Sequence, residues 1–292
     1  MTVSQNAESS ALRTHWEIRA FSVPKNGSSE GENEDAVACN PLHQWMAIAD
    51  GATEASYSRQ WARVLADGFA VSRLMGEFPP PHDQLTRVLG MLQSRWHALV
   101  PWERLEQRGW LFLHKAELGA FATFMGVKFS GPSWQALGVG DCNLFAVTAD
   151  GCVRFSGPAQ SPEEFGNTPA LIPSVPGPGV TKVLESVWTH SSTALRGESI
   201  VCSTDAVAAY LLASLTRKTA QGPRHRHRRR QRQLPNSAAL AALLQVRTLE
   251  EFSTWVDGAR VSGMRNDDST VTIARLCNLK TRADTEGGDG LA

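Results

Sequence analysis

Apolar and polar residues alternate over several short segments of the chain, and this pattern predicts strands. Residues 15–23 alternate in this way. Two short apolar segments, 36–39 and 45–49, flank the turn sequence Asn-Pro-Leu-His and predict a β-hairpin. The same reasoning predicts further strands over residues 122–129, 134–139, 143–148, 152–155, 180–189, 198–203 and 270–276.

Other apolar residues recur with the period of a helix. Trp61, Leu65 and Phe69 are spaced by four, and a second helical stripe over residues 85–99 ends before Pro101. Further helices are predicted over residues 102–118, 206–215, 237–246 and 249–260. Strands and helices come in separate runs and do not alternate as βαβ units. We therefore predict an α+β fold with antiparallel sheets.

The composition is that of a folded protein with reduced cysteines. A hydrophobic share of 42% can build a core and excludes global disorder. The five cysteines are isolated and include no Cys-x-x-Cys pair, which argues against a disulfide framework or a zinc knuckle. The first residues lack the apolar core of a signal peptide, and no apolar run is long enough to cross a bilayer. We expect a cytoplasmic protein that does not contact membranes.

Charge is unevenly placed along a chain whose formal net charge is zero. Residues 224–232 read RHRHRRRQR, so the rest of the chain is mildly acidic. The run lacks interleaved aromatic residues and lies between predicted helices, which favours a surface loop. Binding of nucleic acid or another polyanion through this run remains an alternative. We predict a flexible arm over 1–15, one domain over 16–278 with a basic loop insertion over 217–236, and a flexible tail over 279–292.

Four aspartates lie at the edges of four predicted strands: Asp50, Asp141, Asp205 and Asp267. Several carboxylates on one rim of a buried sheet are costly unless a cation neutralises them. Mg²⁺ or Mn²⁺ suits an all-oxygen site, and two such ions suit phosphoester hydrolysis. Taken singly, an aspartate after a strand is more often a turn residue or a helix cap. The set of four indicates a two-metal phosphatase.

Hairpin symmetry adds a fifth carboxylate to this set. Residue numbers that face each other across an antiparallel hairpin have a constant sum. Asp35 and Asp50 flank the first hairpin almost symmetrically, so we expect them side by side on one rim of the sheet. The same argument places Thr123 opposite Asp141 across the hairpin of residues 122–139.

Five short motifs follow one another in an order that resembles a known family. They are N-E-D-A at 33–36, A-D-G at 49–51, G-x-G-D at 138–141, S-T-D-A at 203–206 and D-D-S-T at 267–270. Together they resemble the metal-dependent protein phosphatases of the PPM type (type 2C serine/threonine phosphatases) in their compact bacterial form. The resemblance covers most of the chain. It implies an α-β-β-α sandwich of two antiparallel sheets flanked by helices.

The resemblance also implies a site with two Mn²⁺ or Mg²⁺ ions and a third, weaker one. Asp50 is expected to bridge the two ions, with the carbonyl of Gly51 on one of them. Asp205 and Asp267 are expected on the other ion, and Asp141 at the third site. The implied reaction is hydrolysis of phosphoserine or phosphothreonine by a hydroxide between the metals. The implied partners are a phosphorylated protein substrate and a cognate serine/threonine kinase.

Three further residues complete the predicted site. Asp35 and Glu34 are expected near the metals, mostly through water, and Asp268 could exchange roles with its neighbour Asp267. Lys25 is a candidate phosphate contact, since no arginine lies just before Asp35.

One departure from the family pattern keeps a second interpretation open. Ala52 stands where many members have a histidine credited with protonating the leaving group. A proton donor typically accounts for ~10²–10⁴-fold in rate, so its loss slows an enzyme without silencing it. A pseudophosphatase, which uses the same fold as a binding module, is therefore the alternative function.

Overall fold

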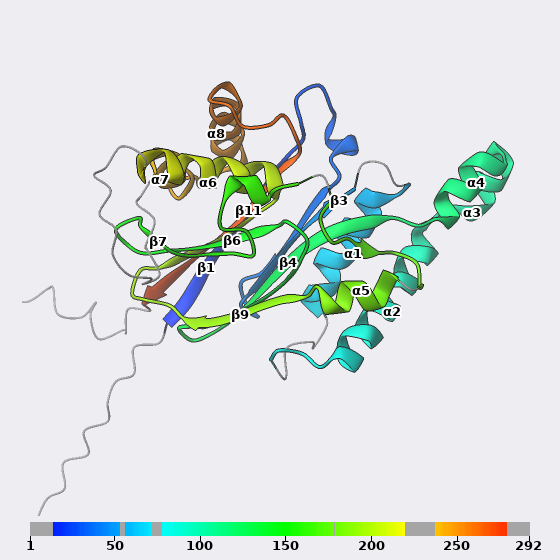
Figure 1. The fold of residues 1–292 in the computed structure, drawn as a ribbon, viewed down its shortest axis with the longest axis horizontal. Helices are drawn as coiled ribbons and strands as arrows, with labels where there is room; N and C mark the ends of the chain where they lie inside the picture. The colour runs from blue at the N-terminus through cyan, green and yellow to red at the C-terminus, as the bar shows by residue number, and fades with distance from the viewer. Residues whose placement is uncertain are drawn as a thin grey trace, which may run out of the picture.

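Two antiparallel sheets lie face to face at the centre of the molecule (Figure 1). The computed structural model describes residues 14–52, 56–71, 78–166, 168–177, 179–219 and 237–278. The first sheet has the order β1 (Thr14–Val23), β11 (Ser269–Asn278), β10 (Ser199–Ser203), β6 (Asn143–Val147), β7 (Val153–Gly157). The second has the order β2 (Asp35–Asn40), β3 (Trp45–Gly51), β4 (Phe121–Ser130), β5 (Ser133–Val139), β9 (Trp188–Thr193), and β8 (Ile172–Pro173) pairs with β4.

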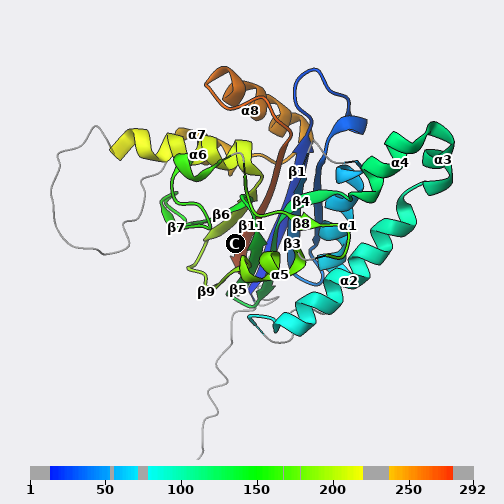
Figure 2. The same cartoon turned by 45° about the vertical axis from the view of Figure 1, so that its right-hand side comes forward.

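Helices cover the outer face of each sheet (Figure 2). On the second sheet lie α1 (Ser58–Val71), α2 (His82–Leu99) and α5 (Gly179–Glu185). On the first sheet lie α6 (Asp205–Thr219), α7 (Ala238–Leu243) and α8 (Leu249–Val261). This arrangement confirms the predicted α+β class and the α-β-β-α sandwich that the resemblance implied.

Strand β3 shows how the sequence builds the layers. Met46 and Ile48 point into the core between the sheets, whereas Ala47 and Ala49 face α1. Both faces of the strand are covered, so its sequence is a continuous apolar run. The small alanine side chains let α1 approach the sheet closely. From the helix side, Trp61 packs into the same layer and is fully buried.

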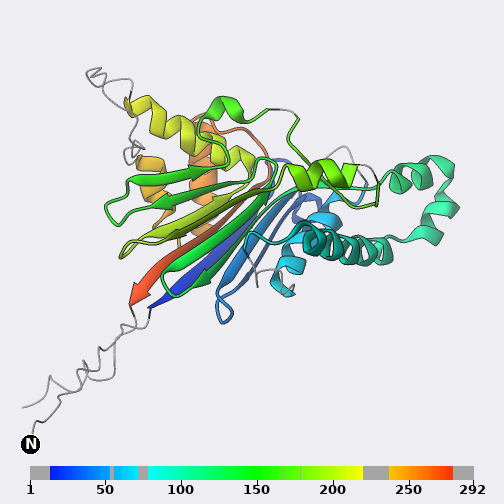
Figure 3. The same ribbon diagram turned by 60° about the horizontal axis from the view of Figure 1, so that its bottom comes forward.

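Two predicted elements differ from the structure. The helix expected over 102–118 is divided into α3 (Trp102–Arg108) and α4 (Trp110–Glu117), which lie away from the sheets (Figure 3). Gly109 between them has φ +111°, which a helix cannot contain. The strand expected over 180–189 is instead α5 followed by β9. The segment contains β-branched residues that favour a strand, but Val183 is buried in the core between the second sheet and its helices. This packing favours the helix over the local preference for a strand.

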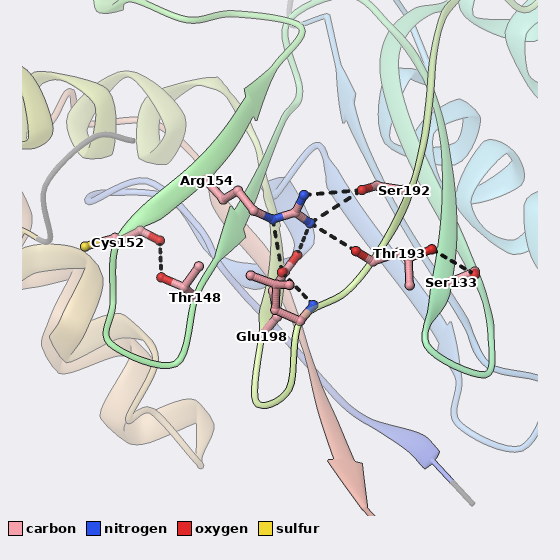
Figure 4. A network of polar contacts seen from close by, with 8 residues as sticks. Ser133, Thr148, Cys152, Arg154, Ser192, Thr193 and Glu198 are labelled. Atoms are coloured by element: carbon pink, nitrogen blue, oxygen red, sulfur yellow. Dashed lines mark hydrogen bonds and ion pairs between the residues drawn. The ribbon is translucent and has the colours of Figure 1, made fainter. Parts of the chain in front are cut away.

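Arg154 on β7 forms an ion pair with Glu198, just before β10 of the same sheet, and hydrogen bonds that reach β9 of the other sheet (Figure 4). The guanidinium of Arg154 donates to both carboxylate oxygens of Glu198, at 2.7 and 3.1 Å. The same group reaches the Ser192 hydroxyl and the Thr193 carbonyl on β9 at 3.4 Å. Glu198 is fully buried and also accepts from the Leu195 amide at 2.9 Å. The pair is therefore bidentate and enclosed, the strong form of such an interaction.

The ends of the described segments bear on the predicted boundaries. Strand β1 begins at Thr14, two residues before the expected start of the domain, and α6 runs to Thr219, into the expected basic insertion. The arginine run 224–232 and the tail 279–292 lie outside the described residues, as do residues 1–13 of the expected arm. Among the described helices, none has the length and apolarity needed to cross a membrane.

Candidate metal centre

Asp35 and Asp50 are direct cross-strand neighbours in the second sheet. The register of β2 with β3 pairs Asp35 with Asp50, as the hairpin symmetry predicts. Asp50 also faces Thr123 across β3 and β4. The two carboxylates therefore start from adjacent backbone positions at the same end of the sheet, where cross-strand Cβ atoms are about 5 Å apart.

The other aspartates come to the same rim from the first sheet and from a turn. Asp205 begins α6, directly after β10, and Asp267 lies two residues before β11. Strands β10 and β11 are neighbours, so their ends bring these two acids together. Asp141 follows β5 in the turn to β6. The charge of Asp50 interacts with those of Asp35, Asp205, Asp141 and Asp267, so all five belong to one electrostatic cluster.

The cluster makes ionisation of its members unfavourable. Burial raises the pKa of Asp50 well above its usual range, and the neighbouring carboxylates, Asp35 first, add to the effect. Burial likewise raises the pKa of Asp35. Burial, followed by the charge of Asp205, raises the pKa of Asp141 to about 6. Such a set calls for a compensating cation.

Thr204 and Thr270, which lie next to β10 and in β11, interact with the Asp35 carboxylate. The Thr204 hydroxyl accepts from the Thr270 amide at 3.1 Å and donates to Asp35 Oδ2 at 3.0 Å. Threonines on the first sheet thus orient an aspartate of the second. Asp35 Oδ1 is buried and has no hydrogen-bond partner among the described residues. A buried carboxylate oxygen without a partner is costly, and a cation would satisfy it.

The structure separates the roles of Asp267 and Asp268. Asp268 is buried and accepts from the Lys25 amide and from the Glu34 amide, both at 2.8 Å. Its two oxygens therefore fasten the loop before β2. The Asp267 side chain is more exposed, at 39%, and its carboxylate forms an ion pair with Arg265. Both Asp268 oxygens are thus occupied by backbone amides, and the assignment of Asp267 as the ligand stays a prediction.

Arg265 is a residue of the site that the sequence reasoning missed. Its Nη2 donates to Asp205 Oδ2 and lies 3.2 Å from Asp267 Oδ2. The prediction looked for a cation only upstream of Asp35. The signal was available, because Arg265 stands two residues before Asp267 in a run that is otherwise uncharged or acidic.

The expected pairing of Thr123 with Asp141 is wrong by one residue. The register of β4 with β5 pairs Phe124 with Val139, which sets Thr123 against Gly140. A Cβ on Gly140 would lie 2.5 Å from the Thr123 side chain, and Gly140 has φ +89°. The two-residue turn between Ser130 and Ser133 sets this register. Thr123 instead neighbours Asp50 and contacts Cys142 Sγ at 3.2 Å.

Three other predicted residues have defined places beside the cluster. The Glu34 carboxylate accepts from the Ser58 hydroxyl at 3.0 Å, and its carbonyl accepts from the Gly51 amide at 3.3 Å. Lys25 contributes its backbone amide to Asp268, and its charge acts on Glu32. Its role as a phosphate contact remains a prediction. The Ala52 amide donates to the Phe121 carbonyl at 2.9 Å, and residues 53–55 lie outside the described residues.

The donor atoms at the rim are of the type that binds divalent cations, although the described side chains do not form a complete set of metal ligands. Within the described segments, no three His, Cys, Asp or Glu side chains are arranged to hold a metal ion as they stand. The donors are nevertheless all carboxylate oxygens, the type that Mg²⁺ and Mn²⁺ prefer. The unpartnered Asp35 Oδ1 and the mutual repulsion at Asp50 both favour a cation. In the structure, Arg265 pairs with Asp205 and Asp267 and offsets one of their two charges.

Comparison with known proteins bears on the fold. No family model matches the sequence, and no curated protein matches it. Solved structures do match over nearly the whole chain. One is PppA, described as a key regulatory component of T6SS in Pseudomonas aeruginosa: TM-score 0.56, 15% identity, 91% of this chain and 99% of PppA.

Two further structures are named as phosphatases. The catalytic domain of the serine/threonine protein phosphatase PstP, solved with two manganese ions, has TM-score 0.56 and 15% identity, covering 91% of this chain and 100% of that one. The photosystem II phosphatase PBCP has TM-score 0.55 and 14% identity, covering 90% and 100%. The chain has the fold of the PPM-type phosphatases. The expectation drawn from the five motifs is thereby confirmed for the fold, and at these identities for the fold alone.

Proposed function

We propose that this protein is a Mn²⁺- or Mg²⁺-dependent phosphatase that hydrolyses phosphoserine and phosphothreonine in proteins. The observation that carries the proposal is the convergence of acids from both sheets on one rim. Asp35 and Asp50 come from the second sheet and Asp205 and Asp267 from the first. A fold needs no such charge concentration for stability, since burying like charges opposes folding. A function that uses a cation explains it.

Each acid has a proposed place around two ions. Asp50 would contact both, as the resemblance to the PPM-type phosphatases implies. The Gly51 carbonyl would complete one position, and Asp205 with Asp267 the other. Asp141 would serve a third, weaker ion. Bound there, the ions would lower the pKa of a shared water and neutralise charge on the phosphoryl oxygens.

The surrounding residues supply orientation. The Thr204 hydroxyl holds Asp35 Oδ2, and Oδ1 is the buried oxygen that a cation would satisfy. Asp268 accepts a hydrogen bond from the Glu34 amide, which fixes the chain where it enters β2 at Asp35. Gly51 permits close approach of α1, since a Cβ there would lie 2.9 Å from Ser58. Lys25 is proposed to contact the substrate phosphate.

The proposed substrate is a phosphorylated protein, and a serine/threonine kinase that makes this phosphoprotein is the proposed functional partner. Ala52 leaves protonation of the leaving group to water. We therefore expect aryl phosphates, whose leaving groups need little protonation, to be turned over faster than alkyl phosphates.

Turnover of p-nitrophenyl phosphate tests the proposal. The wild type, Asp50→Asn and the control Asp67→Asn, an exposed aspartate on α1, are compared with Mn²⁺ and with EDTA. We expect Mn²⁺-dependent turnover for the wild type and the control, and a loss of at least about 10²-fold for Asp50→Asn. Equal rates in all conditions, or no turnover by folded wild type with Mn²⁺, would refute it.

A catalytically silent binding module is the second candidate, and one observation favours it. Arg265 already pairs with two of the proposed ligands, so its one positive charge offsets part of the negative charge of the cluster without metal. In that case the folded wild type would bind a phosphoprotein but release no phosphate with Mn²⁺ or Mg²⁺.

A further inference from the structure

One guanidinium nitrogen lies between two carboxylates at the rim. Arg265 Nη2 contacts Oδ2 of Asp205 and lies 3.2 Å from Oδ2 of Asp267. These two acids are 62 positions apart in the chain and meet only because β10 and β11 are neighbours. The single nitrogen therefore occupies the position from which a cation would contact both oxygens.

We propose that Arg265 is a built-in counter-ion that competes with a divalent cation for Asp205 and Asp267. The cation enters this half of the site only when the guanidinium leaves it. The inference rests on the proposed function, because it concerns the loading of the same site. Of the two main ion positions, this one is then the weaker, and Arg265 sets its affinity.

The backbone around Arg265 is anchored, so only the side chain has to move. Met264 is buried in the core under α6 and α8. On the other side, Arg260 donates to the Asp267 carbonyl at 2.9 Å and to the Pro24 carbonyl at 3.0 Å. Asp268 then fastens the chain to the loop before β2. The backbone of Asp267 thus stays anchored when Arg265 turns away.

The Arg265 side chain has both the exposure and the space for this movement. It is 52% exposed, whereas Asp205 is 16% exposed. It also lines a cavity of about 500 Å³, bordered by Tyr210 of α6 and by Phe165 just after the 3₁₀ turn η2 (Pro162–Glu164). Partly exposed ion pairs are weak and screened by salt, so the guanidinium can be displaced.

Removing the guanidinium should tighten cation binding at this position. Two partly exposed ion pairs oppose displacement, and their combined effect is about tenfold in affinity, which corresponds to about 1.4 kcal/mol. Arg265→Met keeps the length of the side chain and removes the charge. Arg265→Lys keeps the charge but not the planar fork, and its affinity should fall between those of the wild type and Arg265→Met.

Calorimetric titration of Mn²⁺ into the metal-stripped full-length protein measures this directly. The matched control is Arg87→Met, which removes an exposed arginine paired with Asp83 at 3.0 Å on α2, away from the rim. We expect the weaker of the two main Mn²⁺ binding events, leaving aside the third ion proposed at Asp141, to become about tenfold tighter in Arg265→Met and to stay unchanged in Arg87→Met. Thermal unfolding in EDTA is the second readout. Arg265→Met should melt below the wild type there and gain more from added Mn²⁺, because its acids have lost their counter-ion.

The outcomes separate this inference from the proposed function. Mn²⁺ binding of equal or lower affinity in Arg265→Met overturns the inference and leaves the metal site intact. Binding by Arg265→Met but not by the wild type supports it. Absence of Mn²⁺ binding in every folded variant overturns both. If Arg265→Met does not fold, Arg265→Lys decides, and an affinity no higher than that of the wild type overturns the inference.

Discussion

Replacement of Asp141 by asparagine should stabilise the metal-free protein at neutral pH. Burial and the charge of Asp205 raise the pKa of Asp141 from 3.8 to about 6. Asparagine has nearly the same shape and can still accept the hydrogen bond that the backbone amide of residue 141 gives. The substitution therefore removes the charge and retains the local geometry.

The size and sign of the effect follow from this pKa. Because the folded pKa of Asp141 lies above the unfolded one, the folded state binds more protons between about pH 4 and pH 6. Stability of the wild type then falls as pH rises through this window and stays lower above it. At 1.36 kcal/mol per pKa unit, the loss is about 3 kcal/mol at most, and contact with solvent reduces it. Asp141→Asn avoids this loss.

Urea denaturation in EDTA, measured from pH 4 to pH 8, tests the reasoning. We expect Asp141→Asn and the wild type to be equally stable near pH 4, and the variant to be more stable by about 1–3 kcal/mol above pH 6. The exposed Asp67→Asn should show no such pH-dependent difference. A variant that is less stable than the wild type at pH 7.5, or a difference that does not change with pH, would refute the account of the cluster.

Three further predictions concern groups around the rim and the sandwich. Arg154→Met should cost about 3–5 kcal/mol in the free energy of unfolding, because it leaves the buried Glu198 carboxylate without its cation; a loss below about 1 kcal/mol in chemical denaturation would contradict this. Thr204→Val should cost about 1–3 kcal/mol in EDTA, since it removes the hydroxyl that satisfies buried Asp35, and added Mn²⁺ should recover part of the loss of melting temperature. Gly51→Ala should lower both the melting temperature and the Mn²⁺ affinity, because its Cβ would lie 2.9 Å from the backbone of α1 at Ser58. Wild-type values for both would contradict this and would show that α1 can shift to make room for the methyl group.

Local pairing explains which parts of the site could be predicted from sequence. The hairpin of β2 and β3 is short, so counting from its turn gave the pairing of Asp35 with Asp50 correctly. The same counting failed for Thr123, because one residue more or less in a turn shifts the whole register. The short segment of residues 180–189 has no decisive period, and packing of Val183 decided that its first half is helical.

The sequence by itself determined the fold class, the main strands and helices, and the acids worth considering. These depend on periodicity and on contacts between residues close in the chain. Only the tertiary structure decided that Asp205 and Asp267 reach the rim where Asp35 and Asp50 lie, because that requires two sheets to pack face to face. It also decided that Arg265 lies between two of these acids. The Asp268 carboxylate, in turn, accepts hydrogen bonds from backbone amides of the loop before β2. The contacts of Arg265 with Asp205 and of Asp268 with the Lys25 amide join residues far apart in sequence, and no periodic pattern in the chain encodes them.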